Sequence, residues 1–411
     1  MTDPADDLPT SRDEAAALDA RDPLAGVRAR FVPPPGLAYL GGHSLGPPTR
    51  AALAAVRGAS EEAWAEGLVG AWNSAGWIDL PERVATKIAP LIGAGAGEVA
   101  ITDSVSVNLF KLAGAALPFA RARVVAVEAD DFPTDGYVAG GLADLSGAQL
   151  RAVPSGEGAQ AASEGAVLIK STVNYRSGVI ADIEGHEAAA RAGGGLIVWD
   201  LSHATGVVPV ELRARGARLA AGCTYKYLNG GPGAPAFIFA SEEIAAALRN
   251  PVAGWFGHAA PFAFEQDYRP REGAARFEAG TPPILSLVAL DAALDAFAGV
   301  DPAALHEKAG RLGDMLLARA AALGLPPQVP TDRRARGGHV SMAHEDGYPL
   351  VRWLIERGVH GDFRTPDTVR FGLSPLYLTY ESVFAAGEVL AEGVTSRAYD
   401  AERYRARAAV T

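Results

Sequence analysis

Gly195-Leu-Ile-Val-Trp-Asp-Leu-Ser-His203 is the stretch that decides the predicted fold. It is a short apolar run with a carboxylate, Asp200, near its end, and such runs are typical of strands that are buried on both faces of a sheet. A buried carboxylate is costly unless it meets a cation or a strong hydrogen-bond donor. Asp200 is therefore a candidate functional residue, although an Asp at a strand end is more often a helix cap or a turn former.

Further short apolar runs surround this stretch, at residues 124–128, 167–173 and 236–240, and alanine-rich segments that suit helices separate them. Short buried strands that alternate with helices predict an α/β fold, with a large, mostly parallel sheet covered by helices on both faces. Ligands of such sheets bind beyond the carboxyl ends of the strands. We therefore expect the site residues just after each run.

The second deciding stretch is Cys223-Thr-Tyr-Lys-Tyr-Leu-Asn-Gly-Gly-Pro-Gly233, in which Lys226 follows a strand-like segment and precedes a glycine-rich one. Partial desolvation in this setting would lower the pKa of Lys226 and let its amine form a Schiff base with an aldehyde cofactor. Asp200 would hold a pyridine nitrogen protonated, so the two residues together indicate pyridoxal 5′-phosphate (PLP). Taken alone, a lysine is usually a surface residue.

The phosphate of such a cofactor needs a cradle, and residues 102–117 predict one at the start of a helix. Free backbone N–H groups and the helix dipole bind anions there, while plain capping by Asp103 or Ser104 is the alternative. After the run at 124–128, Phe132 is placed to cover a flat ring and Asp135 to approach it. Phe132 alone is more often a core residue.

Composition narrows the class of protein. With 411 residues, 49% of them hydrophobic and 21% charged, the chain is typical of a soluble globular protein of more than one domain. Its formal charge of −11 disfavours nucleic acid as a partner. A single cysteine excludes an intrachain disulfide and a multi-cysteine zinc site, and we expect no metal. The acidic N-terminal segment predicts no signal peptide and no apolar run reaches the ~18 residues of a membrane span, so we expect a cytoplasmic protein without a membrane partner.

Seven motifs occur in order along the chain: Gly41-Gly-His-Ser-Leu-Gly-Pro-Pro48, Gly76-Trp-Ile-Asp79, Ser106-Val-Asn-Leu109, Phe132-Pro-Thr-Asp135, Trp199-Asp-Leu-Ser-His203, Tyr225-Lys-Tyr-Leu-Asn229 and Gly280-Thr-Pro-Pro-Ile-Leu285. Together they resemble the kynureninase family of PLP-dependent enzymes, which has the aspartate aminotransferase fold (fold type I). The resemblance extends from about residue 37 to Arg370. One departure is in the opening motif, which reads Gly41-Gly-His43 where many members of the family have Asn before a residue and Ser-Leu-Gly.

The resemblance assigns a role to each matching residue. Lys226 would carry the cofactor, and Asp200 would pair with its pyridine nitrogen. The other residues implied to surround the cofactor are Val105, Ser106, Phe132 (stacked on the ring), Asp135, Ser171, His203, Tyr225, Trp255 and Thr281. Trp255 and Thr281 would reach across the interface of a homodimer.

The resemblance also implies which residues bind the substrate. Arg370 would clamp the α-carboxylate, since a planar guanidinium binds a carboxylate bidentately, although an arginine on a strand can also be a surface residue. Trp72 and Thr281 stand where members that prefer 3-hydroxykynurenine tend to carry His and Asn. The apolar face of Trp72 therefore predicts a modest preference for L-kynurenine.

The implied reaction is hydrolysis of L-kynurenine to anthranilate and L-alanine by PLP-dependent Cβ–Cγ cleavage, with Tyr225 as an acid/base partner. This reaction belongs to the kynurenine pathway of tryptophan catabolism and NAD biosynthesis. Two alternatives are another fold type I PLP enzyme, such as an epimerase or a lyase, and a non-catalytic PLP-binding module. A cysteine desulfurase is not expected, because the single cysteine, Cys223, lies three residues before Lys226 in strand-like sequence.

The expected domain organisation has three parts. Residues 1–36, which mix charge with proline, form an N-terminal arm, and residues 37–290 form the large cofactor-binding domain. Helical segments at 284–299 and 302–324 lead into a small C-terminal α+β domain, residues 291–411.

Overall fold

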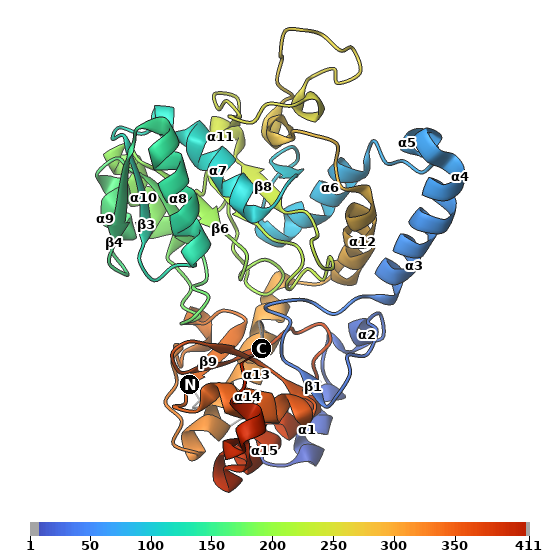
Figure 1. Cartoon of the computed structure of the whole chain (residues 1–411), viewed down its shortest axis with the longest axis vertical. Coiled ribbons are helices and arrows are strands. Elements are labelled where there is room, and N and C mark those ends of the chain that lie inside the picture. The colour runs from blue at the N-terminus through green and yellow to red at the C-terminus, as the bar shows by residue number, and fades with distance from the viewer. Residues whose placement is uncertain (1–7, 408–411) are drawn as a thin grey trace.

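A seven-stranded sheet forms the centre of the larger part of the molecule, in the computed structural model that describes residues 8–407 (Figure 1). The strands run in the order β2-β8-β7-β6-β5-β3-β4. Their bounds are β2 Val99–Ile101, β3 Val124–Glu128, β4 Gln149–Val153, β5 Val167–Ser171, β6 Leu196–Asp200, β7 Leu219–Gly222 and β8 Phe237–Ala240. Neighbouring strands from β4 to β7 are parallel, whereas β8 is antiparallel to both β7 and β2.

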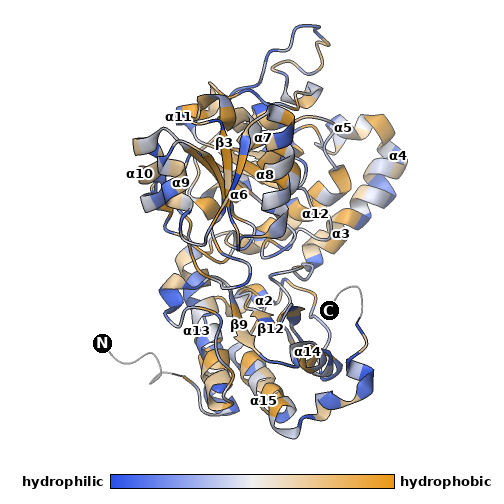
Figure 2. Cartoon of the chain, turned by 60° about the vertical axis from the view of Figure 1, so that its left-hand side comes forward, coloured by the Kyte–Doolittle hydropathy of each residue, from blue (hydrophilic) through white to orange (hydrophobic). Residues whose placement is uncertain are grey.

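The predicted α/β class with a mostly parallel sheet is confirmed, and each predicted apolar run contains a strand. Alternate residues of these strands pack on opposite layers of helices, which explains why the runs are continuously apolar. Val198 packs in one core cluster with α7 (Val105–Ala116) and α8 (Pro133–Ser146). Trp199 packs in the other cluster with α9 (Gly158–Ser163) and α10 (Ile183–Gly193). Figure 2 shows the hydrophobic strands of the sheet enclosed between helices that carry both hydrophobic and hydrophilic residues.

The remaining helices of the larger part lie at its side and top. They are α3 (Arg50–Gly58), a π-helical segment (Ala59–Trp64), α4 (Ala65–Gly67), α5 (Ala71–Ser74), α6 (Leu80–Ile92), α11 (Glu242–Ala245) and α12 (Ile284–Leu294). The segment from α3 to α5 extends away from the sheet, and a long loop after residue 250 projects at the top in Figure 1. Helix α6 ends at Gly93, whose left-handed φ of 66° suits glycine.

The smaller part contains a three-stranded antiparallel sheet in the order β11-β12-β9. Its elements are α13 (Pro302–Ala322), β9 (His339–Ala343), α14 (Gly347–Glu356), β10 (Val359–His360), β11 (Asp362–Arg364), β12 (Thr368–Gly372) and α15 (Tyr380–Ser396). Registry along the hairpin places Asp362 directly opposite Arg370. Two charged side chains of opposite sign are thereby brought together in the interior of the molecule.

The N-terminal segment packs on these C-terminal elements. Helix α1 (Arg12–Asp19) lies along α15, where Asp19 accepts a hydrogen bond from the backbone N–H of Tyr380 at 2.7 Å. A short helix, α2 (Ala25–Arg28), follows, and β1 (Ala38–Tyr39) then pairs in parallel with β10. Residues 1–7 of the predicted arm and 408–411 of the predicted small domain lie outside the described residues. The predicted division at residues 36 and 290 stays a prediction. Within residues 8–407, the helices are too short or too polar to cross a membrane.

Candidate active site

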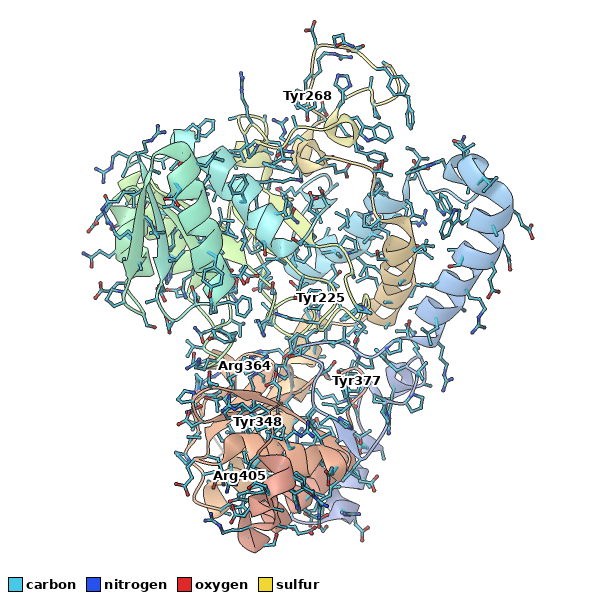
Figure 3. The ribbon with its side chains drawn as sticks, in the orientation of Figure 1. Tyr225, Tyr268, Tyr348, Arg364, Tyr377 and Arg405 are labelled. Atoms are coloured by element: carbon cyan, nitrogen blue, oxygen red, sulfur yellow. The ribbon has the colours of Figure 1, made fainter. Side chains whose placement is uncertain are left out.

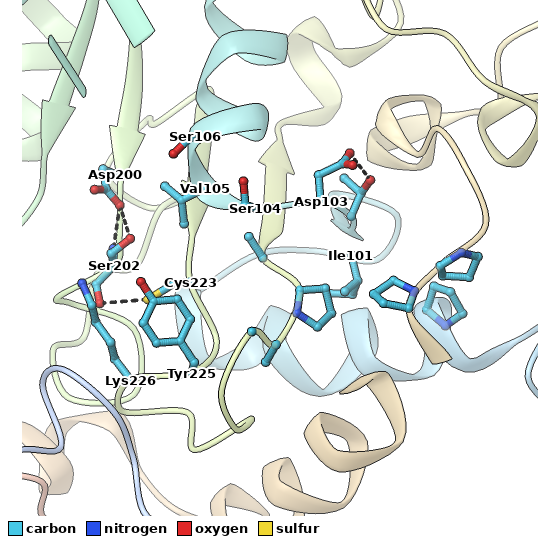
Figure 4. Close-up of a pocket in the computed structure, with 18 of the residues that line it drawn as sticks. Ile101, Asp103, Ser104, Val105, Ser106, Asp200, Ser202, Cys223, Tyr225 and Lys226 are labelled. Atoms are coloured by element: carbon cyan, nitrogen blue, oxygen red, sulfur yellow. Dashed lines mark hydrogen bonds between the residues drawn. The ribbon is translucent and has the colours of Figure 1, made fainter. Parts of the chain in front are cut away.

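A cavity of about 570 Å³ opens where β6 ends, β7 ends and α7 begins (Figure 4). This is the carboxyl edge of the parallel strands, where the sequence predicts the site. The predicted residues that line it are Val105, Ser106, Phe132, Asp135, Asp200, His203, Tyr225, Lys226 and Thr281.

Asp200 lies at the last position of β6 and is only 6% exposed. Its Oδ1 accepts a hydrogen bond from the backbone N–H of Ser202 at 2.8 Å and another from the Ser202 hydroxyl. Burial raises the pKa of Asp200, and the charge of Lys226 offsets this only in part. A further N–H donor with positive charge would therefore be stabilised beside Asp200.

Asp135, in the first turn of α8, is a second buried carboxyl group that favours a positively charged ligand in the cavity. Its pKa is raised well above the ordinary value by burial and by repulsion from Asp200 and Asp131. Ser171, at the end of β5, donates a hydrogen bond to Asp135 at 3.4 Å and so supports the cavity from behind without lining it. The site accordingly favours a cationic ligand next to two carboxyl groups.

Lys226 follows β7, and its Nζ lies 3.4 Å from Nδ1 of His203. Burial, followed by the charges of Lys226 and Arg370, lowers the pKa of His203 well below its ordinary value. The imidazole is therefore neutral and does not repel the lysine. The ring of Tyr225 lies on another side of Nζ, with its centroid 5.9 Å away, and burial raises the pKa of its phenol.

The start of α7 faces the cavity with Val105 and Ser106. Ser104 is the N-cap, but its side chain makes no capping hydrogen bond. The carboxylate of Asp103 instead accepts from Thr102 at 2.7 Å and forms an ion pair with the buried Lys111. The alternative of plain capping is therefore wrong, and the N–H groups of the first turn remain able to bind an anion.

The aromatic residues divide into those at the cavity and those behind it. Phe132 lines the cavity and meets the ring of Tyr175 edge-on, at a centroid distance of 5.3 Å. Trp72 and Trp255 do not line it. Both pack against Phe256, at 6.1 and 4.7 Å, and Phe256 itself is a lining residue that the sequence did not point to.

Arg370 is placed differently from the other predicted residues. It is 1% exposed on β12 and is not part of the cavity lining. Its Nε and Nη2 donate to the two carboxylate oxygens of Asp362 at 2.9 and 2.7 Å, and Nη1 donates to the carbonyl of Tyr175. The alternative of a surface arginine is therefore wrong.

Sequence reasoning missed Asp362, and it also missed Glu278 in the cavity wall. Reading residues 362–370 as a hairpin would have placed Asp362 opposite Arg370. Glu278 has no comparable signal, since its position follows from an irregular loop. Burial raises its pKa to about 7, although Arg271 lies 2.8 Å away.

Solved structures with a similar fold define the class of protein. A cysteine desulfurase from Thermococcus onnurineus NA1 is 18% identical, with a TM-score of 0.72 over 87% of this chain and 94% of that one. A variant of the cystine C–S lyase C-DES with glycine covalently linked to the PLP cofactor is 16% identical, with a TM-score of 0.75 over 88% of this chain and 98% of that one. The fold is that of the fold type I PLP-dependent enzymes.

Sequence relatives define the family within this class. Kynureninases from Pseudomonas fluorescens and from Burkholderia pseudomallei (strain 1106a) are each 43% identical over 98% of this chain and 100% of their own length. The family model of the kynureninase C-terminal domain matches residues 305–390. The chain belongs to the kynureninase family.

Proposed function

We propose that this chain hydrolyses L-kynurenine to anthranilate and L-alanine, with PLP as cofactor. The observation that carries the proposal is the convergence of Lys226, Asp200 and the uncapped start of α7 on one cavity, in a chain 43% identical to kynureninases over nearly its full length. The enzyme is a PLP-dependent hydrolase.

The residues present fit the cofactor. Asp200 is a buried carboxylate without full charge compensation, which suits a protonated ring nitrogen. The free N–H groups at the start of α7 suit a phosphate, and Val105 and Ser106 border them. When bound through Lys226, PLP supplies an electron sink for the bonds at the substrate Cα.

Lys226 and its neighbours move protons at the substrate. With the cofactor and substrate bound, Nζ of Lys226 would take the Cα proton of the substrate. Neutral His203, 3.4 Å away, provides a ring nitrogen beside Nζ without adding a second positive charge. Asp200 would hold the proton on the pyridine nitrogen of the bound cofactor.

Tyr225 serves the later steps, in which water adds to the γ-carbonyl and the Cβ–Cγ bond breaks. Its raised pKa keeps the phenol protonated, so its O–H can donate to the carbonyl oxygen or return a proton to the carbon left after cleavage. Phe132, which lines the cavity, would stack on the cofactor ring. Arg370 binds the substrate α-carboxylate in this scheme.

The preference for L-kynurenine over 3-hydroxykynurenine is the finer part of the proposal. Thr281 lines the cavity, whereas Trp72 acts through Phe256, on which it packs. An apolar wall excludes an extra hydroxyl only weakly, by ~100-fold at most. A clear kcat/KM advantage for 3-hydroxykynurenine would contradict these roles of Thr281 and Trp72.

Assembly and location complete the proposal. We expect a cytoplasmic homodimer in which Trp255 and Thr281 contribute to the partner subunit's site. Trp255 is 37% exposed, and Phe262, 5.6 Å away across the projecting loop, is 57% exposed, so both have apolar surface for a second copy to cover. A fully active monomer in sedimentation at assay concentration would contradict the dimer.

Incubation of the purified PLP-loaded protein with L-kynurenine, followed by the fluorescence of anthranilate, tests the function directly. We expect equal amounts of anthranilate and L-alanine. A protein that binds PLP but releases no anthranilate would instead support the non-catalytic module.

A further inference from the structure

The turn at residues 41–46 connects the two ends of the proposed active site. At one end, the backbone N–H of Gly46 donates to the carbonyl of Tyr225 at 2.8 Å, next to Lys226. At the other end, Leu40 is bonded to both β10 and β12, through His360 at 2.8 Å and Gly372 at 2.7 Å. In Figure 3, Tyr225 and Arg364 lie on facing sides of the junction that this turn spans.

Two side chains of the turn converge on Asp362. The Nε2 atom of His43 lies 3.2 Å from Oδ2, and the hydroxyl of Ser44 donates to the same oxygen at 3.0 Å. Asp362 in turn binds Arg370 through both carboxylate oxygens. A continuous set of contacts therefore runs from this turn to the guanidinium group.

The residues around His43 leave space that fits its imidazole ring. The side chain is fully buried, and a Cβ on Gly372 would collide with its ring. The ring stacks on His339 at a centroid distance of 5.9 Å, and His339 meets His203 edge-on at 5.8 Å. His43 is thus held in one orientation by packing, which is what a residue needs to fix the position of another.

The groups around Asp362 carry more positive than negative charge, which favours the binding of an anion. Arg364 lies 3.0 Å from Oδ2, so two guanidinium groups share one carboxylate. Burial and the neighbouring Arg370 lower the pKa of His43 to about 4, so its imidazole is neutral near pH 7. A guanidinium has five N–H groups, and Arg370 uses three of them on Asp362 and Tyr175. One N–H on each terminal nitrogen remains for a carboxylate.

We propose that His43 is a positioning residue for substrate binding: by holding Asp362, it orients Arg370 so that its two remaining N–H groups meet the α-carboxylate. This inference rests on the proposed function, in which Arg370 binds that carboxylate.

The test compares two ligands of the PLP-loaded protein, L-alanine and ethylamine, which differ in the carboxylate. Each affinity is measured by the change in absorbance of the bound cofactor. For His43→Ala we expect the affinity for L-alanine to fall by about tenfold, because Asp362 loses a contact that fixes it and Arg370 loses its orientation, and that for ethylamine to stay within about twofold. His43→Asn should restore L-alanine binding to within about threefold of the wild type.

His360→Ala is the matched control, because His360 lies on the adjoining β10 and packs on Tyr39 rather than on Asp362. If His43→Ala does not fold, His43→Leu removes the contact with Asp362 at similar volume and should show the same tenfold loss. Equal weakening of both ligands, or unchanged L-alanine binding, would overturn the inference. Failure of the wild type to release anthranilate would count against the proposed function, whereas the comparison of the two amines tests His43 separately.

Discussion

Two buried carboxylates, Asp200 and Asp362, stand at opposite ends of the proposed site, and the protein surrounds them in opposite ways. Asp200 receives neutral donors from Ser202 and only partial compensation from Lys226, so burial raises its pKa. Burial alone would also raise the pKa of Asp362, but His43 and Arg370 beside it lower the pKa well below its ordinary value. Asp200 therefore lacks a positively charged partner, which a cofactor can supply. Asp362 already has its partner in Arg370, and its proposed role is to orient that arginine.

The largest expected effect is at the Asp200 end. Lys226→Met removes both the amine that we propose carries PLP and the cation that opposes the rise in the pKa of Asp200, so turnover should fall by roughly a thousandfold or more. Anthranilate fluorescence measures this loss. Borohydride reduction of the wild type followed by peptide mapping should place the pyridoxyl group on Lys226, and a label on the buried Lys111 or Lys170 would contradict the assignment.

The second prediction concerns the contribution of Asp362, at the other end of the proposed site, to the stability of the fold. Asp362→Asn leaves the buried guanidinium of Arg370 without its ion pair, so the free energy of unfolding should fall by about 3 to 5 kcal/mol. Denaturant unfolding of the cofactor-free protein measures it. Asp200→Asn in the same experiment should cost little, because that carboxylate has no strong pair to lose. Similar losses of unfolding free energy for Asp362→Asn and Asp200→Asn would contradict the difference between the two carboxylates.

The third prediction is the activity of Asp200→Asn. The amide cannot hold the proton on the pyridine nitrogen, so kcat should fall by roughly 100-fold to 1000-fold, the range found when one stabilising contact of a transition state is removed. Steady-state kinetics at saturating L-kynurenine measures it, with the cofactor content checked by absorbance. Turnover equal to that of the wild type would remove Asp200 from its role.

The smallest expected effect is a pH dependence from His43. Its pKa is about 4 in the folded protein against 6.5 when unfolded, so between these values the unfolded chain binds more protons. Stability should therefore fall as the pH is lowered from 6.5 to 4, by up to about 3 kcal/mol from this group. His43→Asn should reduce the slope over this window without abolishing it, because burial also lowers the pKa of His203 and His339, as measured by urea unfolding at each pH. An unchanged slope would contradict a neutral, buried imidazole.

Most of the site at the sheet could be predicted because it depends on local pattern. Each short apolar run predicts where a strand ends, and parallel strands bring their ends to one edge, so Asp200 and Lys226 were expected to lie together. The free start of α7 could not be decided, since capping by Asp103 or Ser104 fits the same residues. The ion pair of Asp103 with Lys111 shows that Asp103 does not cap the helix, and that pair depends on the packing of α7.

The sequence by itself determined the α/β class and the family, and it predicted that Lys226 and Asp200 act together, because strand periodicity and contiguous motifs extend over only a few neighbouring residues. Only the tertiary structure decided that Arg370 is held by Asp362 and that His43 and Ser44 reach the same carboxylate. Ser44 and Asp362 are 318 residues apart in the chain. Their contact follows from how β1, β10 and β12 pack together, and that packing depends on the whole fold rather than on any local pattern.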